Sequence, residues 1–199
     1  IHDDIIDKAD LRRGKKTLHI ENGVYNSIIL GNYLVTLCCE YVSKYNFEDY
    51  YYNFFHLTDL CDSEIKQQAL LFNFDISFSD YINKTKNKTA LLIAASLVGG
   101  AKLANVSDKE LIMLYNYGIN LGISFQIIDD ILDFTQDKSN LGKPNGADLI
   151  NGNITLPVIF ALKNKKINSE IRKLSKTSPI KDFQKCIQYI INSKAIKKS

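Results

Sequence analysis

Apolar side chains recur every three or four positions along most of the chain, which is the spacing of one face of an α-helix. This pattern predicts helices over residues 24–42, 64–74, 89–104 and 108–136, with a last one near 180–192. The elements are separated by short polar stretches. We find no internal repeat at a fixed period.

The strongest helix signal covers residues 108–136. It follows Ser107, a candidate N-cap, and Glu110 stands three residues later, as in a capping box. The only candidate strand, the aromatic run 50–55, lacks a hairpin partner with turn residues. The sequence therefore predicts an all-α fold.

Residues 136–155 form the clearest non-helical stretch. They contain Gly142, Pro144, Gly146 and Gly152 among Asn and Asp, a composition typical of a polar surface loop between two helices. A loop of this length is long enough to be functional.

The chain has 199 residues, which fits one domain with a single substantial core. It opens at Ile1 without a capping residue, as if inside a helix. We therefore expect a single domain over 1–199 that lacks its N-terminal helices.

Composition limits the possible functions. With 25 basic and 22 acidic residues the net charge is only +3, so an overall basic field for nucleic acid is missing. Four cysteines without a CxxC pair indicate a reducing, intracellular compartment and no zinc site. The chain has no uninterrupted apolar run of about 18 residues, and we expect it to be soluble. GxSxG, P-loop and GxGxxG patterns are absent.

Two acidic motifs carry the chemistry. DDIID contains Asp3, Asp4 and Asp7, and DDILD contains Asp129, Asp130 and Asp133. The first and last acids of each motif are four residues apart and so share a helix face.

Like charges at this spacing repel one another, and a divalent cation would offset the repulsion. Oxygen ligands favour Mg²⁺, which completes its coordination shell with water and substrate phosphates. A single motif is more often a solvated acidic surface. Apolar residues surround the second motif, however, and buried carboxylates need cations, so the two motifs together favour a magnesium diphosphate site.

Several cationic and polar residues are candidate phosphate ligands. Arg12 and Arg13 are adjacent in a chain with only three arginines. One guanidinium group can donate two parallel hydrogen bonds to the oxygens of a phosphate. Lys88 and Thr89 begin a predicted helix, where free N–H groups favour anions. Lys143 and His2 adjoin the acidic motifs. Taken alone, each of these residues is more often an ordinary polar or charged residue on the protein surface.

In these residues the chain resembles the trans-isoprenyl diphosphate synthase (polyprenyl synthetase) family. HDDIIDKADLRRGKKTLH is similar to its first aspartate-rich motif, and FQIIDDILDF to its second. YINKTKNKTALLIAASLVGGA is similar to its lysine-threonine helix, and GKPNGADLINGNITLPVIFAL to the loop and helix that follow. The match runs in the family's order to about Leu162, and the first motif is closest to long-chain members such as octaprenyl diphosphate synthase.

The resemblance implies an isoprenoid-synthase helical bundle around a central cavity. It also implies Mg²⁺-dependent, head-to-tail condensation of isopentenyl diphosphate with an allylic diphosphate, in a homodimer or a heteromer. The implied metal ligands are the six motif acids, with Asp4 in support: Asp3, Asp4, Asp7, Asp129, Asp130 and Asp133. The implied contacts to the allylic diphosphate are Arg12, Lys88, Thr89, Gln126 and Lys143, and those to isopentenyl diphosphate are Arg13 and His2. The implied catalytic set is Asp3, Asp7, Arg12, Lys88 and Asp129.

Two departures and two alternatives remain open. The family has further helices before its first motif, which this chain lacks, and Asn32 stands where the family usually has aspartate. The main alternative is a non-catalytic regulatory subunit of a heteromeric prenyl diphosphate synthase, although both motifs are intact. A terpene cyclase is a third reading, but the second motif and the arginine pair fit elongation better.

Overall fold

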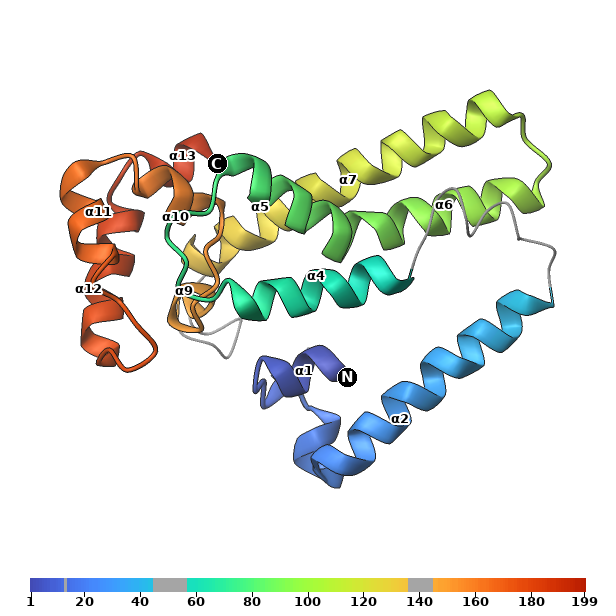
Figure 1. Cartoon of the computed structure of the whole chain (residues 1–199), viewed down its shortest axis with the longest axis horizontal. Helices are drawn as coiled ribbons and strands as arrows, with labels where there is room; N and C mark the ends of the chain where they lie inside the picture. The colour runs from blue at the N-terminus through green and yellow to red at the C-terminus, as the bar shows by residue number, and fades with distance from the viewer. Residues whose placement is uncertain (13, 45–56, 136–144) are drawn as a thin grey trace. The chain divides into compact units, whose positions relative to one another are not determined.

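The computed structural model describes residues 1–12, 14–44, 57–135 and 145–199 and consists almost entirely of helices (Figure 1). The predicted all-α fold is confirmed. The elements are α1 (His2–Ile6), β1 (Leu11–Arg12), β2 (Lys15–Lys16), α2 (Leu18–Ser43), α4 (Leu57–Ala69), α5 (Phe78–Thr85), the π-helix η1 (Lys86–Ala90), α6 (Leu91–Leu103), α7 (Asp108–Thr135), α9 (Ala147–Ile150), α10 (Leu156–Ala161), α11 (Lys165–Ile171), α12 (Ile180–Ile191) and α13 (Ala195–Lys198). They form two compact units that divide between α2 and α4.

The first unit contains a small hairpin between its two helices. Strands β1 and β2 pair antiparallel, with Leu11 opposite Lys16 and Arg12 opposite Lys15. Gly14 lies between the strands at a φ of 76°, in the left-handed region that glycine adopts without strain. The hairpin follows the first acidic motif directly and presents Arg12 beside it.

Helix α2 bends at Gly23, whose φ of 79° and ψ of 157° are not helical. The predicted helix 24–42 corresponds to the part that follows this bend. The two parts of α2 do not share one helix axis, so the regular spacing of apolar residues used for the prediction begins only after Gly23. The predicted aromatic strand at 50–55 lies outside the described residues.

The second unit is organised around α7. The helix predicted over 108–136 is confirmed almost to the residue. Its capping box is present as well: the Glu110 carboxylate accepts the Ser107 backbone N–H at 2.8 Å, and the Ser107 hydroxyl accepts the Glu110 backbone N–H at 3.4 Å. Helix α4 covers 57–69 where the sequence predicted 64–74.

Helix α6 packs along α7 through small residues. A Cβ built at Gly118 would lie 2.5 Å from Ala94 Cα, and one at Gly122 would lie 2.4 Å from Ala90 Cα. Only glycine permits such an approach to a neighbouring backbone. The small residues therefore bring the C-terminal half of α7 against η1.

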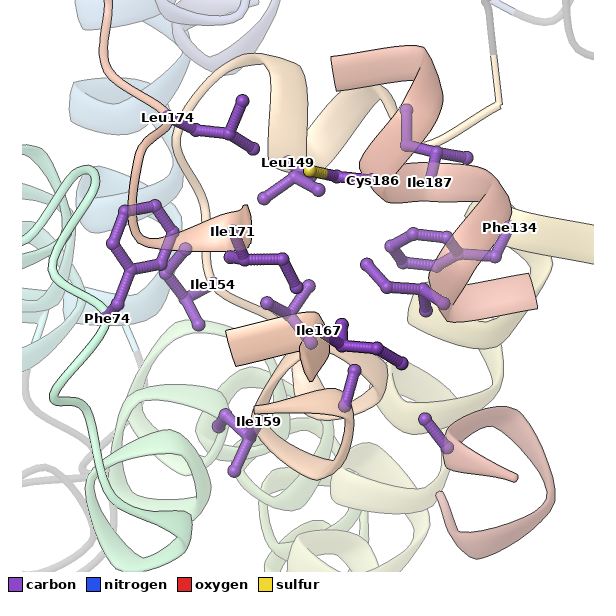
Figure 2. Packing of buried hydrophobic residues seen from close by; sticks show 14 of the residues in the cluster. Phe74, Phe134, Leu149, Ile154, Ile159, Ile167, Ile171, Leu174, Cys186 and Ile187 are labelled. Carbon is purple, nitrogen blue, oxygen red and sulfur yellow. The ribbon is translucent and has the colours of Figure 1, made fainter. Parts of the chain in front are cut away.

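The buried core of the second unit gathers where α7 ends and the C-terminal helices begin (Figure 2). Phe134, Leu149 and Ile171 are at most 1% exposed, and Ile154 is 3% exposed. The prediction of a polar surface loop over 136–155 is therefore wrong for its second half, because α9 folds back into this core. Residues 136–144 lie outside the described part.

Among the described residues, α7 is the one helix long and apolar enough to cross a membrane by length and composition. The sequence criterion of an uninterrupted apolar run did not identify it, because acidic and polar residues interrupt the helix. Length and composition are weak evidence that α7 spans a membrane, because this helix contains the second acidic motif and packs along α6. All four cysteines are free thiols.

Candidate active site

The first acidic motif lies on and just after α1. Asp3 is exposed and Asp7 is half-buried, whereas Asp4 is only 6% exposed. The Asp4 carboxylate accepts a hydrogen bond from Arg12 Nε at 2.5 Å, and this bond raises the pKa of Arg12. Asp4 therefore fixes the arginine beside the motif and leaves Asp3 accessible to a ligand.

The His2 ring packs against α2. Its Nε2 lies 3.3 Å from the Ile28 carbonyl oxygen, and a Cβ at Gly31 would lie 2.5 Å from the same nitrogen. Gly31 thus makes the space that the ring occupies. Arg13, the other residue predicted to contact isopentenyl diphosphate, lies outside the described residues.

The second acidic motif lies near the end of α7. Asp129 is exposed, whereas Asp130 is 2% exposed and both of its oxygens accept hydrogen bonds. Tyr81 donates from its hydroxyl at 2.6 Å, and Gln126 donates from Nε2 at 2.9 Å. Burial is the main cause that raises the pKa of Tyr81, and the neighbouring Asp130 raises it further. The middle acid of this motif, like Asp4 in the first, already has partners within the protein.

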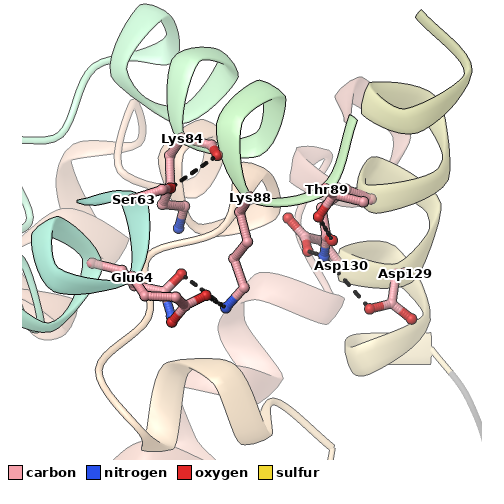
Figure 3. Close-up of polar contacts among 9 residues, drawn as sticks. Ser63, Glu64, Lys84, Lys88, Thr89, Asp129 and Asp130 are labelled. Atoms are coloured by element: carbon pink, nitrogen blue, oxygen red, sulfur yellow. Dashed lines mark hydrogen bonds and ion pairs between the residues drawn. The ribbon is translucent and has the colours of Figure 1, made fainter. Parts of the chain in front are cut away.

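The same hydrogen-bond network extends to the lysine-threonine segment. Thr89 donates from its hydroxyl to Gln126 Oε1 at 2.8 Å, so Gln126 joins Thr89 to Asp130 (Figure 3). Gln126 Nε2 also lies 3.5 Å from an oxygen of Asp129. Three predicted site residues, Thr89, Gln126 and Asp129, are thus brought together.

The segment that carries Lys88 and Thr89 is the π-helix η1, which continues α5. Wide turns of this kind are often found at functional sites. The sequence predicted a helix beginning at residue 89 and missed α5. A readable signal was present, since the Ser77 hydroxyl and the Asp80 carboxylate form a capping box at the start of α5.

Asp133 is held by α9. Its carboxylate accepts the backbone N–H groups of Ala147 at 3.1 Å and Asp148 at 3.2 Å. Burial raises the pKa of Asp133 to about 6, even though these hydrogen bonds lower it. Burial also raises the pKa of Asp148 to about 7, with the charge of Asp133 as the next cause. Sequence reasoning missed Asp148, because nothing in its polar surroundings showed that it would be buried beside the motif.

Lys84 is a second residue that the sequence did not single out. Burial lowers the pKa of its ammonium group, whereas the nearby charges of Asp130 and Asp148 raise it. Lys84 therefore places a positive charge among the carboxylates of the motif. Lys143, predicted to contact the diphosphate, lies outside the described residues.

Lys88 faces α4 (Figure 3). Its ammonium nitrogen lies 2.7 Å from Glu64 Oε1 and 3.4 Å from Gln67 Oε1. Lys88 and Glu64 are both half-buried. The predicted phosphate ligand is thus already paired with a carboxylate.

The carboxylates of α7 suit a hard divalent cation. Asp129, Asp130, Asp133 and Asp148 lie close together, since the charge of Asp129 contributes to raising the pKa values of the other three. Oxygen ligands are those that Mg²⁺ and Ca²⁺ take. Asp129 is the exposed member of this group. Within the described ranges no three His, Cys, Asp or Glu side chains are grouped to hold a metal ion by themselves.

Comparisons with known proteins show the family of the chain. A model of the Polyprenyl synthetase family matches residues 1–190. The chain is 40% identical over 200 residues to solanesyl diphosphate synthase 2, chloroplastic, of Arabidopsis thaliana, covering all of this chain and 48% of that protein. It is 36% identical over 201 residues to heptaprenyl diphosphate synthase component 2 of Bacillus subtilis (strain 168), covering all of this chain and 58% of that protein.

Solved structures show the same fold. The heptaprenyl diphosphate synthase from Staphylococcus aureus matches with a TM-score of 0.93 and 38% identity, over 99% of this chain and 63% of that one. The polyprenyl synthase from Caulobacter crescentus CB15, complexed with calcium and isoprenyl diphosphate, matches with a TM-score of 0.84 and 29% identity, over 99% of this chain and 62% of that one. The chain spans less than two thirds of each of these relatives. Because the family model covers both acidic motifs, the chain belongs to the polyprenyl synthetase family.

Proposed function

We propose that the chain carries the diphosphate-binding part of a prenyltransferase that lengthens an allylic diphosphate by one isopentenyl unit per cycle. The C–O bond of the allylic diphosphate breaks, and the diphosphate leaves with the electron pair. The terminal alkene carbon of isopentenyl diphosphate bonds to the allylic carbon, and loss of a proton forms the new double bond. Family membership supports this reaction, and residues 1–199 would form one polyprenyl synthetase domain.

The observation that carries the proposal is the hydrogen-bond network of Thr89, Gln126 and Asp130 beside the exposed Asp129. It holds polar groups and an accessible carboxylate together, and Lys88 directly precedes Thr89 in η1. Thr89 and Lys88 would bind oxygens of the allylic diphosphate, and Arg12 is a further phosphate ligand that we propose from the family resemblance. Fixed donors of this kind stabilise the charge that grows on the leaving group.

We infer that Asp3, Asp7 and Asp129 are the accessible carboxylates for Mg²⁺, with Asp133 near Asp129 on α7. Bound Mg²⁺ would stabilise the departing diphosphate electrostatically. Asp4 and Asp130 would act by holding Arg12 and Gln126. The Caulobacter polyprenyl synthase, which was crystallised with calcium and isoprenyl diphosphate, supports a divalent cation and a diphosphate ligand.

The alternative is a subunit of a heteromeric synthase, since the Bacillus subtilis relative is named a component. A homodimer is the assembly that we propose first, because the accessible acids of both motifs are present in one chain. The relatives are chloroplastic and bacterial proteins. Together with four free cysteines they support a reducing compartment inside a cell or organelle.

The test is product analysis. The chain, and the longest protein that its gene encodes, are incubated with Mg²⁺, labelled isopentenyl diphosphate and farnesyl or geranylgeranyl diphosphate. We expect longer prenyl diphosphates from the longest protein. We also expect their loss in Asp129→Asn, with an unchanged circular dichroism spectrum. Asp62→Asn, which alters an exposed acid on α4, serves as the matched control and should remain active.

Two outcomes would change the proposal. Full activity of Asp129→Asn would remove this carboxylate from the mechanism. If no product forms with the protein alone but product forms after a second protein is added, the subunit alternative is correct.

A further inference from the structure

Lys88 is held from helix α4 by one ion pair and one hydrogen bond. Glu64 and Gln67 are three residues apart and therefore share one face of α4. Glu64 Oε1 forms an ion pair with the Lys88 ammonium nitrogen at 2.7 Å, and Gln67 Oε1 accepts a hydrogen bond from the same nitrogen at 3.4 Å. Figure 3 shows the lysine side chain crossing from η1 to this face of α4.

The ion pair differs from the surface pairs of the same unit. The side chains of Lys88 and Glu64 are 28% and 15% exposed, whereas those of Lys66 and Asp62, a pair within α4, are 69% and 57% exposed. Exposed pairs contribute little because water screens them and the side chains remain free to move. The partly buried pair is screened less and restricts Lys88 more.

A lysine side chain is flexible, and much of its rotamer freedom is lost when its ammonium group is fixed on a ligand. Anchoring by α4 removes part of this freedom before a ligand arrives. An ammonium group has three N–H donors, so pairing with Glu64 and Gln67 still leaves a donor for a phosphate oxygen. The ammonium group of Lys88 is thereby held in one place before a ligand arrives.

We propose that Glu64 is a positioning residue, which holds the Lys88 ammonium in the place where it binds the diphosphate of the allylic substrate. This role rests on the proposed function. Glu64 itself touches no substrate and acts through Lys88. Gln67 contributes in the same direction, to a smaller extent because its contact is longer.

A double-mutant cycle tests the role. Calorimetry in Mg²⁺ measures the Kd of a thio-linked allylic diphosphate analogue, which cannot ionise, for wild type, Glu64→Ala, Lys88→Ala and the double variant. We expect Glu64→Ala to raise Kd about tenfold in the wild-type background, as for the loss of one charged contact. In the Lys88→Ala background the same change should leave Kd within about twofold, since the residue that Glu64 positions is gone.

Conservative and control variants make the result specific. Glu64→Gln keeps the size and the acceptor oxygen and should weaken binding less than Glu64→Ala does. Asp62→Asn removes an acid from the same helix and should leave Kd unchanged. Thermal unfolding of every variant separates lost binding from lost fold, and Glu64→Gln carries the test if Glu64→Ala does not fold.

Three results would overturn the role. An equal effect of Glu64→Ala with and without Lys88 would mean that Glu64 acts through the packing of α4. Tighter binding by Glu64→Gln would mean that the carboxylate competes with the diphosphate for Lys88. Failure of the folded wild type to bind the analogue would instead refute the proposed function, and the positioning role with it.

Discussion

The close approach of α7 to η1 predicts a large effect from one added methyl group. Gly122→Ala places a Cβ 2.4 Å from Ala90 Cα, a backbone atom that cannot move aside alone. Ordinary van der Waals contact begins at 3.4 Å, so the helices must separate by about 1 Å at this point. Ala90 directly follows Thr89, whose hydroxyl donates to Gln126 on α7.

The magnitude follows from this displacement. The Thr89–Gln126 hydrogen bond is 2.8 Å long, and about 1 Å of extension takes it beyond bonding distance. Overpacking costs about 1–3 kcal/mol, while alanine gains about 1 kcal/mol over glycine in a helix interior. We therefore expect a net loss of up to about 2 kcal/mol in the free energy of unfolding. A displacement of about 1 Å at the site lowers turnover about 100-fold.

Urea unfolding and product formation measure the two effects. Gly100→Ala is the matched control, because it is also a helical glycine but a Cβ there meets nothing within 4 Å. We expect this control to keep its activity and to gain up to about 1 kcal/mol of stability. Wild-type stability and activity in Gly122→Ala would show that the helix contact does not set the site geometry.

Three further predictions concern the acidic cluster. Since the pKa values of Asp133 and Asp148 in the folded state, about 6 and about 7, lie above their ordinary value of 3.8, metal-free stability should fall as the pH rises from about 4 to 7. Asp148→Asn should flatten this fall, and equal urea midpoint shifts in both proteins would contradict the linkage. Tyr81→Phe should cost about 1–3 kcal/mol in urea unfolding, because a buried oxygen of Asp130 loses its donor. Magnesium diphosphate should raise Tm in wild type and less in Asp129→Asn, and an equal rise would remove this acid from the ligand set.

Local signals explain why much of the helical fold could be predicted. The spacing of apolar residues and the Ser107–Glu110 capping box located α7 almost to the residue, because both features depend only on residues close together in the sequence. The missed helix α5 is only eight residues long, although Phe78, Tyr81 and Ile82 follow the spacing of one helix face. Its capping box at Ser77 and Asp80 was present in the sequence and could have been used.

Tertiary contacts explain what the sequence missed. The prediction assigned all acids of a motif to metal, and their spacing cannot distinguish the exposed Asp129 from the buried Asp130. That difference depends on Tyr81, 49 residues earlier in the chain. Asp148 likewise becomes part of the cluster only because α9 folds back onto Asp133. Neither the amino-acid composition nor the spacing of apolar residues shows which residues distant in the sequence will be in contact.

The first two acids of each acidic motif differ in the same way in their burial and contacts. In each, the second acid is buried and bound to a polar side chain of the site: Asp4 to Arg12, and Asp130 to Gln126. The first acid of each motif, Asp3 or Asp129, remains exposed. Adjacent residues of a helix point about 100° apart. The side chain of one aspartate can therefore face the protein interior while that of its neighbour faces solvent. The paired aspartates thus place a polar side chain, held by the buried acid, next to an accessible carboxylate.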